Sequence, residues 1–337
     1  MVERAALIDA FLRRAGWPGE RRALAGDASF RRYERIRHHG RSAVLMDAPP
    51  PVEDVRPFIA IDRLLCGFGL SAPRILAEDA GAGLLLLEDL GDDTFTRLLA
   101  KGEDEPALYA LAVDTLVALH RLPAARAAPD FVPPYDDRRL LDEAALLAEW
   151  YLPAIDGRPT AEATAREWRD LWAVALRAAR HVPETLVLRD FHVDNLIRIP
   201  GRAGVAACGL LDFQDAVRGP VAYDLVSLLE DARRDIAPAL VAGLRRRYLD
   251  AFPSLDPAAL DRAMAVLGAQ RHAKVIGIFT RLCVRDGKPD YLRHIPRVWR
   301  LLDAALAREP ALAPVAVWLD AHVPPARRIV PSVGARP

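Results

Sequence analysis

The sequence predicts an α+β fold of two lobes, a small β-rich N-lobe followed by a larger, mainly helical C-lobe. Short strand-like runs separated by turn residues are concentrated in the first ninety residues. After Leu90 the apolar residues recur at helical spacing, Ala is abundant, and Pro stands at several helix starts, where its missing N–H costs nothing. The strand-like runs of this second part flank a single polar stretch, residues 188–195.

The helices and strands of the N-lobe are predicted from the spacing of apolar residues and from turn residues. Residues 1–16 mix charged and apolar residues at helical spacing and predict an amphipathic helix. Residues 23–46 predict antiparallel strands with a turn at 38–40, and three prolines at 49–51 end that set. The apolar spacing of residues 53–68 predicts a crossing helix. Two further strands are expected at 74–77 and 84–88.

The C-lobe is expected to be a set of helices. The predicted helices cover residues 108–122, 138–151, 160–181, 223–234, 238–252, 257–282 and 289–306. The predicted domains are therefore residues 1–89, a nucleotide-binding N-lobe; 90–324, the C-lobe; and 325–337, a Pro- and Arg-rich tail expected to be flexible.

Composition limits the class of protein. The 337 residues are 52% hydrophobic and 27% charged, as in ordinary globular proteins. The formal net charge is zero and the pI is about 7.1, which gives no reason to expect nucleic-acid or membrane partners. Cys66, Cys208 and Cys283 have no metal-ligand spacing and are expected to be buried thiols of a reducing compartment. With no apolar run of about 18 residues and no signal-peptide core, a cytoplasmic location is expected.

The polar stretch carries the candidate chemistry. It reads Leu188-Arg-Asp-Phe-His-Val-Asp-Asn195, and Asp212 follows the next apolar run. In phosphoryl transfer an Asp faces the attacking hydroxyl, while an Asn and a second Asp hold Mg²⁺ against the phosphates. Asp190, Asn195 and Asp212 fit these roles. An Asp and Asn at this spacing also occur in solvated turns, but the flanking strands and Asp212 favour phosphoryl transfer.

The chain resembles the aminoglycoside-phosphotransferase-like superfamily, which has a protein-kinase-like fold. The strings that carry the resemblance are Gly26–Tyr33, Val44–Pro50, Leu86–Asp92 and Leu211–Ala216. Gln270 to Trp299 further resembles the branch of bacterial anomeric kinases of N-acetylmuramate and N-acetylglucosamine, which act in peptidoglycan recycling. The resemblance covers about residues 20 to 305 and implies ATP and Mg²⁺ as cofactors.

The resemblance also implies site roles. Asp190 would be the catalytic base, with Asn195 and Asp212 as metal ligands. Glu88, Asp89 and Leu90 would form the connector whose backbone pairs with adenine. Ser29 and Phe30 would lie at the phosphates, although the stretch lacks the Gly-rich pattern of protein kinases and on its own predicts a hairpin turn.

Two departures from the family pattern stand out. Met46 lies at or near the position of the usual nucleotide lysine, and Phe58 near that of its glutamate partner. Losing both together leaves no unpaired buried charge. The nearest cations are Arg31 and Arg32, and strand alternation would point one of them toward the phosphates. Arg32 is the predicted nucleotide-binding residue.

The sugar-binding residues are the least determined by sequence. The candidates are His192, Gln214, Asp215, Tyr151, Arg271 and Lys274. Residues 271–300 are strongly basic, which fits either a solvated face or a site for the lactyl carboxylate of N-acetylmuramate. A polycationic aminoglycoside would need an acidic cleft instead. Tyr151 could stack on a sugar, although core packing is the commoner role.

Several alternatives remain open at this point. The chain could phosphorylate choline, an amino alcohol or another sugar, or it could be a non-catalytic nucleotide-binding module. A metal-dependent hydrolase using Asp190, His192 and Asp194 is a weaker third possibility, because it does not explain the β-rich lobe. The sequence does not set the oligomeric state or the preference between the two amino sugars.

Overall fold

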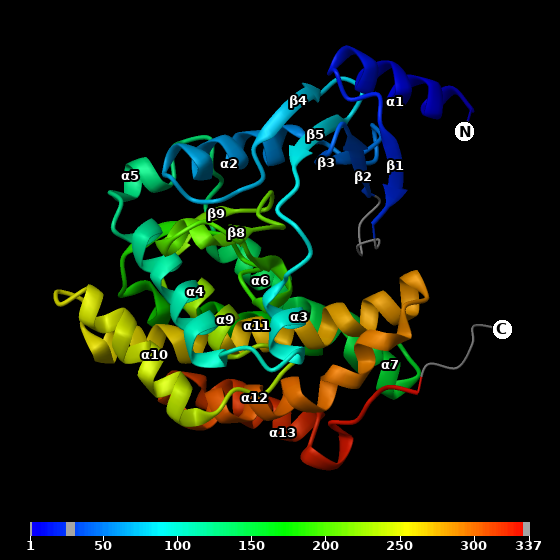
Figure 1. Ribbon diagram of the computed structural model, residues 1–337. Helices are drawn as coiled ribbons and strands as arrows, with labels where there is room; N and C mark the ends of the chain where they lie inside the picture. The colour runs from blue at the N-terminus through cyan, green and yellow to red at the C-terminus, as the bar shows by residue number, and fades with distance from the viewer. Residues whose placement is uncertain (1, 25–30, 333–337) are drawn as a thin grey trace. The chain divides into compact units, whose positions relative to one another are not determined.

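The polypeptide divides into two compact units in the computed structural model, which describes residues 2–24 and 31–332 (Figure 1). Unit 1 comprises the chain up to Thr115 together with Val193–Ala216. Unit 2 comprises Leu116–His192 and the chain from Val217 onward. The N-terminal sheet and the largely helical C-terminal part confirm the predicted α+β class.

Unit 1 is built on a five-stranded antiparallel sheet with the strand order β1-β2-β3-β5-β4. Its strands are β1 (Glu20–Ala23), β2 (Arg32–His38), β3 (Arg41–Asp47), β4 (Ile75–Asp79) and β5 (Leu84–Glu88). Helix α1 (Val2–Arg14) buries Ile8, Phe11 and Leu12 in a cluster with Ile36, Leu45 and Leu86 of the sheet. Successive side chains of a strand point to opposite faces. Tyr33, Arg35, Val44, Met46 and Leu87 therefore lie on the face opposite this cluster.

Residues 193–216 belong to unit 1, whereas the sequence placed the domain boundary at residue 89. They form the hairpin of β7 (Leu196–Arg198) and β8 (Cys208–Leu210). The hairpin is fixed by the hydrogen bond from Leu210 N to Ser71 O, at 2.9 Å, and by the ion pair of Arg202 with Glu88, at 2.6 Å. These long-range bonds leave no local signal in the sequence.

The remaining helices of unit 1 are α2 (Arg56–Gly67), α3 (Phe95–Ala100) and the first part of α4 (Glu105–His120), which continues into unit 2. The crossing helix expected at 53–68 is α2. Its first turn has Pro57, and Phe58, Ile59, Ile61 and Leu65 are buried.

Unit 2 is arranged around the 30-residue helix α11 (Pro257–Asp286), which packs against α6, α9 and α12 (Figure 1). Its other helices are α5 (Ala124–Ala127), α6 (Asp137–Leu146), α7 (Leu152–Asp156), α8 (Glu162–Ala175), α9 (Ala222–Leu229), α10 (Pro238–Ala251), α12 (Ile295–Arg308) and α13 (Ala313–His322). A Cβ on Gly277 of α11 would lie 2.3 Å from the carbonyl carbon of Leu146. Gly277 therefore permits the close approach of α11 to the end of α6.

Local pattern predicted the strand that precedes residue 188, observed as β6 (Glu184–Val187), but it missed α3, α13 and the strand β9 (Val217–Pro220), which pairs with β6. The β9 segment contains Gly219 and Pro220, which are rare in strands, so pairing with β6 and not propensity makes it a strand. The helix expected over 160–181 ends at Ala175 and continues as a 3₁₀ turn.

The expected flexible tail is packed onto unit 2 as far as it is described, to residue 332. Arg328 pairs with Asp303 and Asp320, at 2.6 Å each. The Tyr151 hydroxyl donates to the backbone oxygens of Arg327 and Ile329. Residues 333–337 lie outside the described part. In the ranges that the structure describes, no helix has the length and apolar character needed to cross a bilayer.

Candidate active site

A cavity of ≈390 Å³ lies within unit 1 on the Tyr33–Val44 face of the sheet. It brings together the connector after β5 and both predicted metal ligands. Residues lining it include Tyr33, Arg35, Val44, Phe58, Leu87, Glu88, Asp89, Leu90, Asn195, Ile197, Leu211 and Asp212. Residues separated by more than a hundred positions in the sequence thus form one wall.

The connector side chains hold unit 1 together. Asp89 accepts hydrogen bonds from Arg35, at 2.7 and 2.9 Å, and from Ser42. Burial opposes ionisation of Asp89, but these donors outweigh it and keep its pKa below the ordinary value. Glu88 pairs with Arg74 and Arg202. Within the described ranges the Leu90 backbone forms no hydrogen bond, so its N–H and C=O can pair with a base edge.

The β7–β8 hairpin brings Asn195 and Asp212 together, because they stand where its two strands diverge. The Leu211 N–H donates to Asn195 O at 3.0 Å. The Asn195 amide nitrogen lies 3.5 Å from Asp212 Oδ2, and Gln214 donates to Asp212 Oδ1 at 2.8 Å. Asp212 has a φ of +58°, a conformation that Asp tolerates better than most residues and that is common at functional sites.

The donor set of this pair fits a hard cation. Mg²⁺ binds through one or two protein oxygens together with substrate phosphates. Asp212 supplies a carboxylate, and rotation of the Asn195 amide by half a turn presents its oxygen. No group of three His, Cys, Asp or Glu side chains in the described chain is arranged to hold a metal. A site here would combine the Asp212 carboxylate with amide and phosphate oxygens.

Arg31 and not Arg32 stands on the Asp212 side of β2. The Arg31 guanidinium lies 3.5 Å from Asp212 Oδ1 and is 11% exposed. Arg32 pairs in register with Asp47, is exposed, and alternates with Tyr33 to the opposite face. Met46 is on the cavity face of the sheet but only 1% exposed, and it is not among the residues that line the cavity. Ser29 and Phe30 lie outside the described residues.

In unit 2, Asp224 of α9 holds the loop that carries Asp190. Its carboxylate accepts the N–H groups of Leu188, at 2.6 Å, and Arg189, at 2.9 Å. Burial raises the pKa of Asp224 to about 7. Arg189, immediately before Asp190, has a φ of +71°. A long side chain at such a φ is strained, and surrounding bonds must hold it there.

Charged side chains of unit 2 are concentrated around Glu143 of α6. This buried carboxylate binds Lys274 at 3.1 Å and also pairs with Arg189 and with the Tyr135 hydroxyl. Burial would raise the pKa of Glu143, but Lys274 and Arg189 outweigh it and lower that pKa. Lys274 thus already has an anionic partner.

Asp190 is influenced by the same cations. Burial alone would raise the pKa of Asp190, but the charges of Lys274 and Arg271 outweigh it, so the pKa lies below the ordinary value. His192 is buried, and burial together with Arg233 lowers its pKa to about 4. The imidazole is therefore neutral at pH 7, with Nε2 3.4 Å from Arg233.

The remaining residues that the sequence suggested for sugar binding have different environments in the structure. Gln214 orients Asp212, and Asp215 is exposed. Tyr151 is fully buried against Trp299, with ring centroids 5.4 Å apart, and its hydroxyl holds the C-terminal segment. We therefore assign Tyr151 a packing role and do not place it at a sugar. Sequence reasoning missed Glu143, since an acidic residue on an amphipathic helix predicts a solvated face.

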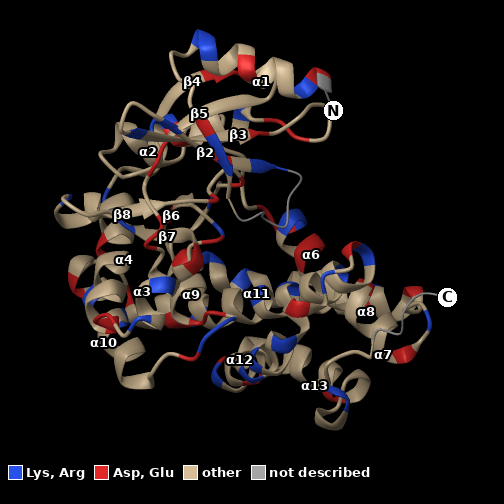
Figure 2. Cartoon of the chain, turned by 45° about the vertical axis from the view of Figure 1, so that its right-hand side comes forward, with Lys and Arg blue, Asp and Glu red and all other residues tan. Residues whose placement is uncertain are grey.

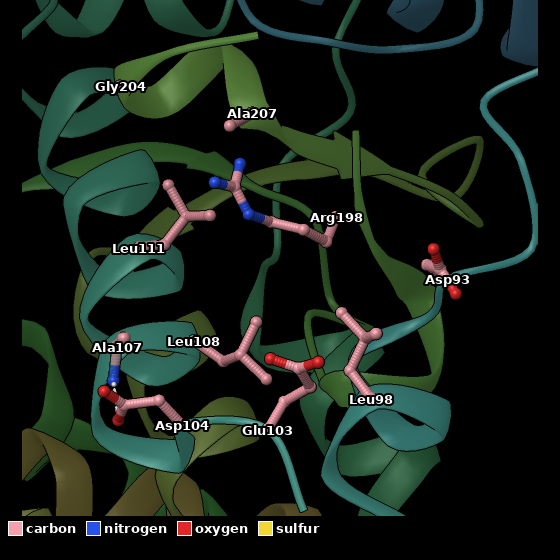
Figure 3. Close-up of a pocket in the computed structure, with 10 residues that line it drawn as sticks. All are labelled: Asp93, Leu98, Glu103, Asp104, Ala107, Leu108, Leu111, Arg198, Gly204 and Ala207. Atoms are coloured by element: carbon pink, nitrogen blue, oxygen red, sulfur yellow. Dashed lines mark hydrogen bonds between the residues drawn. The ribbon is translucent and has the colours of Figure 1, made fainter. Parts of the chain in front are cut away.

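A second cavity of unit 1, of ≈380 Å³, holds none of the predicted site residues (Figure 3). Its lining comes from α3, α4 and the β7–β8 region, including Leu108, Leu111 and Arg198. This cavity shares no lining residue with the cavity that contains Asn195 and Asp212.

Curated relatives share sequence over most of the chain. An N-acetylmuramate/N-acetylglucosamine kinase of Caulobacter vibrioides is 40% identical, over 96% of this chain and 97% of the relative. A Pseudomonas aeruginosa protein of the same name is 41% identical, over 88% of each chain. A Neisseria meningitidis protein of that name is 37% identical, over 86% of this chain and 87% of its own.

Solved structures share the fold at low identity. The ADP-bound aminoglycoside phosphotransferase APH(2″)-Ib matches with a TM-score of 0.60 and 16% identity, over 90% of this chain and 99% of its own. Choline kinase LicA of Streptococcus pneumoniae matches with a TM-score of 0.60 and 11% identity, over the same shares. The family model described as "Phosphotransferase enzyme family" matches residues 20–261. The chain therefore belongs to the phosphotransferase enzyme family.

Proposed function

We propose that this protein is an ATP-dependent kinase that phosphorylates the anomeric C1 hydroxyl of N-acetylmuramate, N-acetylglucosamine or both, in peptidoglycan recycling. The proposal is supported by the 37–41% identity to curated kinases of these two sugars over most of the chain. The partners are small molecules, the sugar and ATP. We infer a cytoplasmic location, where such a nucleotide is available.

One observation carries the nucleotide part of the proposal. The connector Glu88–Leu90 and the Asn195–Asp212 pair line the same cavity of unit 1. A connector with an unused backbone edge suits adenine, and a carboxylate beside an amide suits Mg²⁺ on phosphates. Asn195 and Asp212 would hold this ion, which would neutralise phosphate charge. Arg31, beside Asp212, is the proposed phosphate cation in place of the family lysine.

Asp190 is the proposed base. Because its pKa lies below the ordinary value, it is ionised at neutral pH and able to accept the hydroxyl proton. It is a weak base, so the contribution expected from it is orientation of the hydroxyl more than proton affinity. The hydrogen bonds that the Leu188 and Arg189 amides donate to Asp224 hold the loop that carries Asp190.

ADP release over a substrate panel tests the proposal. The panel contains N-acetylmuramate, N-acetylglucosamine, choline, ethanolamine and an aminoglycoside. We expect activity with the N-acetylated sugars, and a sugar 1-phosphate identified by phosphorus NMR. The methyl glycosides of the same sugars lack a free C1 hydroxyl and are the matched control. Turnover of a methyl glycoside, or activity with choline alone, would refute the assignment.

A further inference from the structure

Arg271 of α11 is a buried cation without a direct partner. It is 4% exposed, and its Nη1 is buried with no hydrogen-bond partner. Across the described ranges its guanidinium forms no hydrogen bond or ion pair. Burying a charge without a partner costs several kcal/mol in general, so such a side chain is a candidate to receive an anion.

Several other cations of this region are already engaged. Lys274, three residues further along α11, binds Glu143, and Arg189 pairs with the same carboxylate. Arg308 and His272 share Glu230. Figure 2 shows further basic side chains, all of them arginines, along α12, where Arg297 and Arg300 both pair with Asp235.

Arg271 is also close enough to Asp190 to act on it. Its charge contributes to the electrostatic environment of Asp190, His192 and Asp224, all in unit 2. Asp224 is occupied by two backbone amides, and His192 is neutral at pH 7. An anionic group that binds Arg271 would thus stand near the hydroxyl that Asp190 orients.

We propose that Arg271 binds the carboxylate of an acidic amino sugar and so sets the preference for N-acetylmuramate over N-acetylglucosamine. The inference rests on the proposed function. The two sugars differ by the lactyl ether on C3 of N-acetylmuramate, which carries a carboxylate two ring carbons from C1. A guanidinium binds a carboxylate through two parallel hydrogen bonds, which a neutral hydroxyl does not match.

The test is steady-state kinetics of Arg271→Met with both sugars. We expect the KM for N-acetylmuramate to rise about 10- to 100-fold, the factor for loss of a charge-assisted hydrogen bond. The KM for N-acetylglucosamine and the KM for ATP should stay within about threefold of the parent. Arg271→Lys should recover part of the difference, because a point charge replaces the bidentate fork. Arg285→Met, at the exposed end of α11, is the matched control and should change neither sugar's KM.

Two outcomes would contradict the proposals, and they can be told apart. If Arg271→Met raises the KM for ATP and impairs both sugars equally, Arg271 binds phosphate and the inference is wrong. If the parent phosphorylates neither sugar, the proposed function itself fails. Thermal unfolding checks the fold, because replacing an unpaired buried charge by Met should leave the melting temperature unchanged or raise it. A stabilisation of the parent by N-acetylmuramate that is absent in Arg271→Met gives a readout independent of turnover.

Discussion

The cavity of unit 1 and the charged cluster of unit 2 use ionic side chains in opposite ways. In unit 1 the carboxylates of Glu88 and Asp89 are bound to arginines of the same unit, and the backbone is left for the ligand. In unit 2, Glu143 is buried between two cations, while Arg271 is buried with no direct partner.

This contrast indicates which substitutions should destabilise each unit. The ion pairs of Glu88 and Asp89 are only partly buried and contribute less free energy than fully buried pairs, so the cavity of unit 1 depends mainly on strand register and on the β7–β8 hairpin. Buried charges are costly when one partner is removed, so the cluster of unit 2 depends on charge balance. Removing the charge of one partner of an ion pair should therefore lower the free energy of unfolding little in unit 1 and strongly in unit 2.

The largest effect is expected for Asp190→Asn, which keeps the shape of the side chain but removes its charge. Turnover should fall by a factor of about a hundred to ten thousand, the range for a lost general base. Affinity for ATP and the circular dichroism spectrum should stay unchanged. Turnover within a fewfold of the parent would show that Asp190 is not the base.

Removing the charge of Glu143 should be the most destabilising change in the cluster. Glu143→Gln leaves Lys274 and Arg189 buried without their anion, which should cost about 3–5 kcal/mol of unfolding free energy. Urea unfolding at pH 7 measures this. Asp142→Asn is the control on the same helix, since Asp142 is exposed and should contribute no more than about 1 kcal/mol. Equal losses for the two variants would contradict the contrast between buried and exposed pairs.

Asp212→Ala tests the metal assignment in unit 1. It removes the carboxylate beside Asn195, and both turnover and Mg²⁺-dependent ATP affinity should fall, the affinity by about tenfold or more. ATP binding measured across a Mg²⁺ titration is the readout. Nucleotide affinity equal to the parent's at every Mg²⁺ concentration would overturn the assignment. The fold should survive, because Asp212 is not part of the buried core.

Arg31 and Arg32 are a matched pair for the phosphate contact. Arg31→Met should raise the KM for ATP about 10- to 100-fold, whereas Arg32→Met should stay within about threefold. The physical reason is strand alternation, which puts Arg31 beside Asp212 and Arg32 on the other face. The reverse result would show that the cation lies where the sequence first placed it, at Arg32.

The smallest effect concerns Asp62 of α2, which is 2% exposed and has a buried oxygen without a hydrogen-bond partner. Burial raises its pKa from 3.8 to about 7. The folded protein therefore holds a proton that the unfolded chain has released, and stability from this group is lost as pH rises from about 4 through 7. Asp62→Asn should flatten that decline and stabilise the protein at pH 8 by about 1–3 kcal/mol. Asp54→Asn, at an exposed site, should leave the pH profile unchanged.

Local patterns in the sequence are sufficient to predict the fold class, most helices and strands, and the family. They also single out Asp190, Asn195 and Asp212, because these signals are local. Apolar periodicity identifies elements, and the Asp–Asn spacing with Asp212 after a strand identifies the candidate chemistry. Family membership is confirmed by the match over residues 20–261, while the roles of these three residues stay predictions.

Which polar residues have partners depends on contacts between segments that are distant in the sequence. Glu143 appears in the sequence as one more acid on an amphipathic helix, and α11 brings Lys274 to it from 131 positions away in the chain. Likewise, the alternation of side chains at the start of β2 places Arg31 and not Arg32 beside Asp212. The hydrogen bonds and ion pairs of residues 193–216 place these residues in unit 1. Burial and pairing arise from contacts between distant segments, so a partnerless Arg271 can be recognised only after the chain has folded around it.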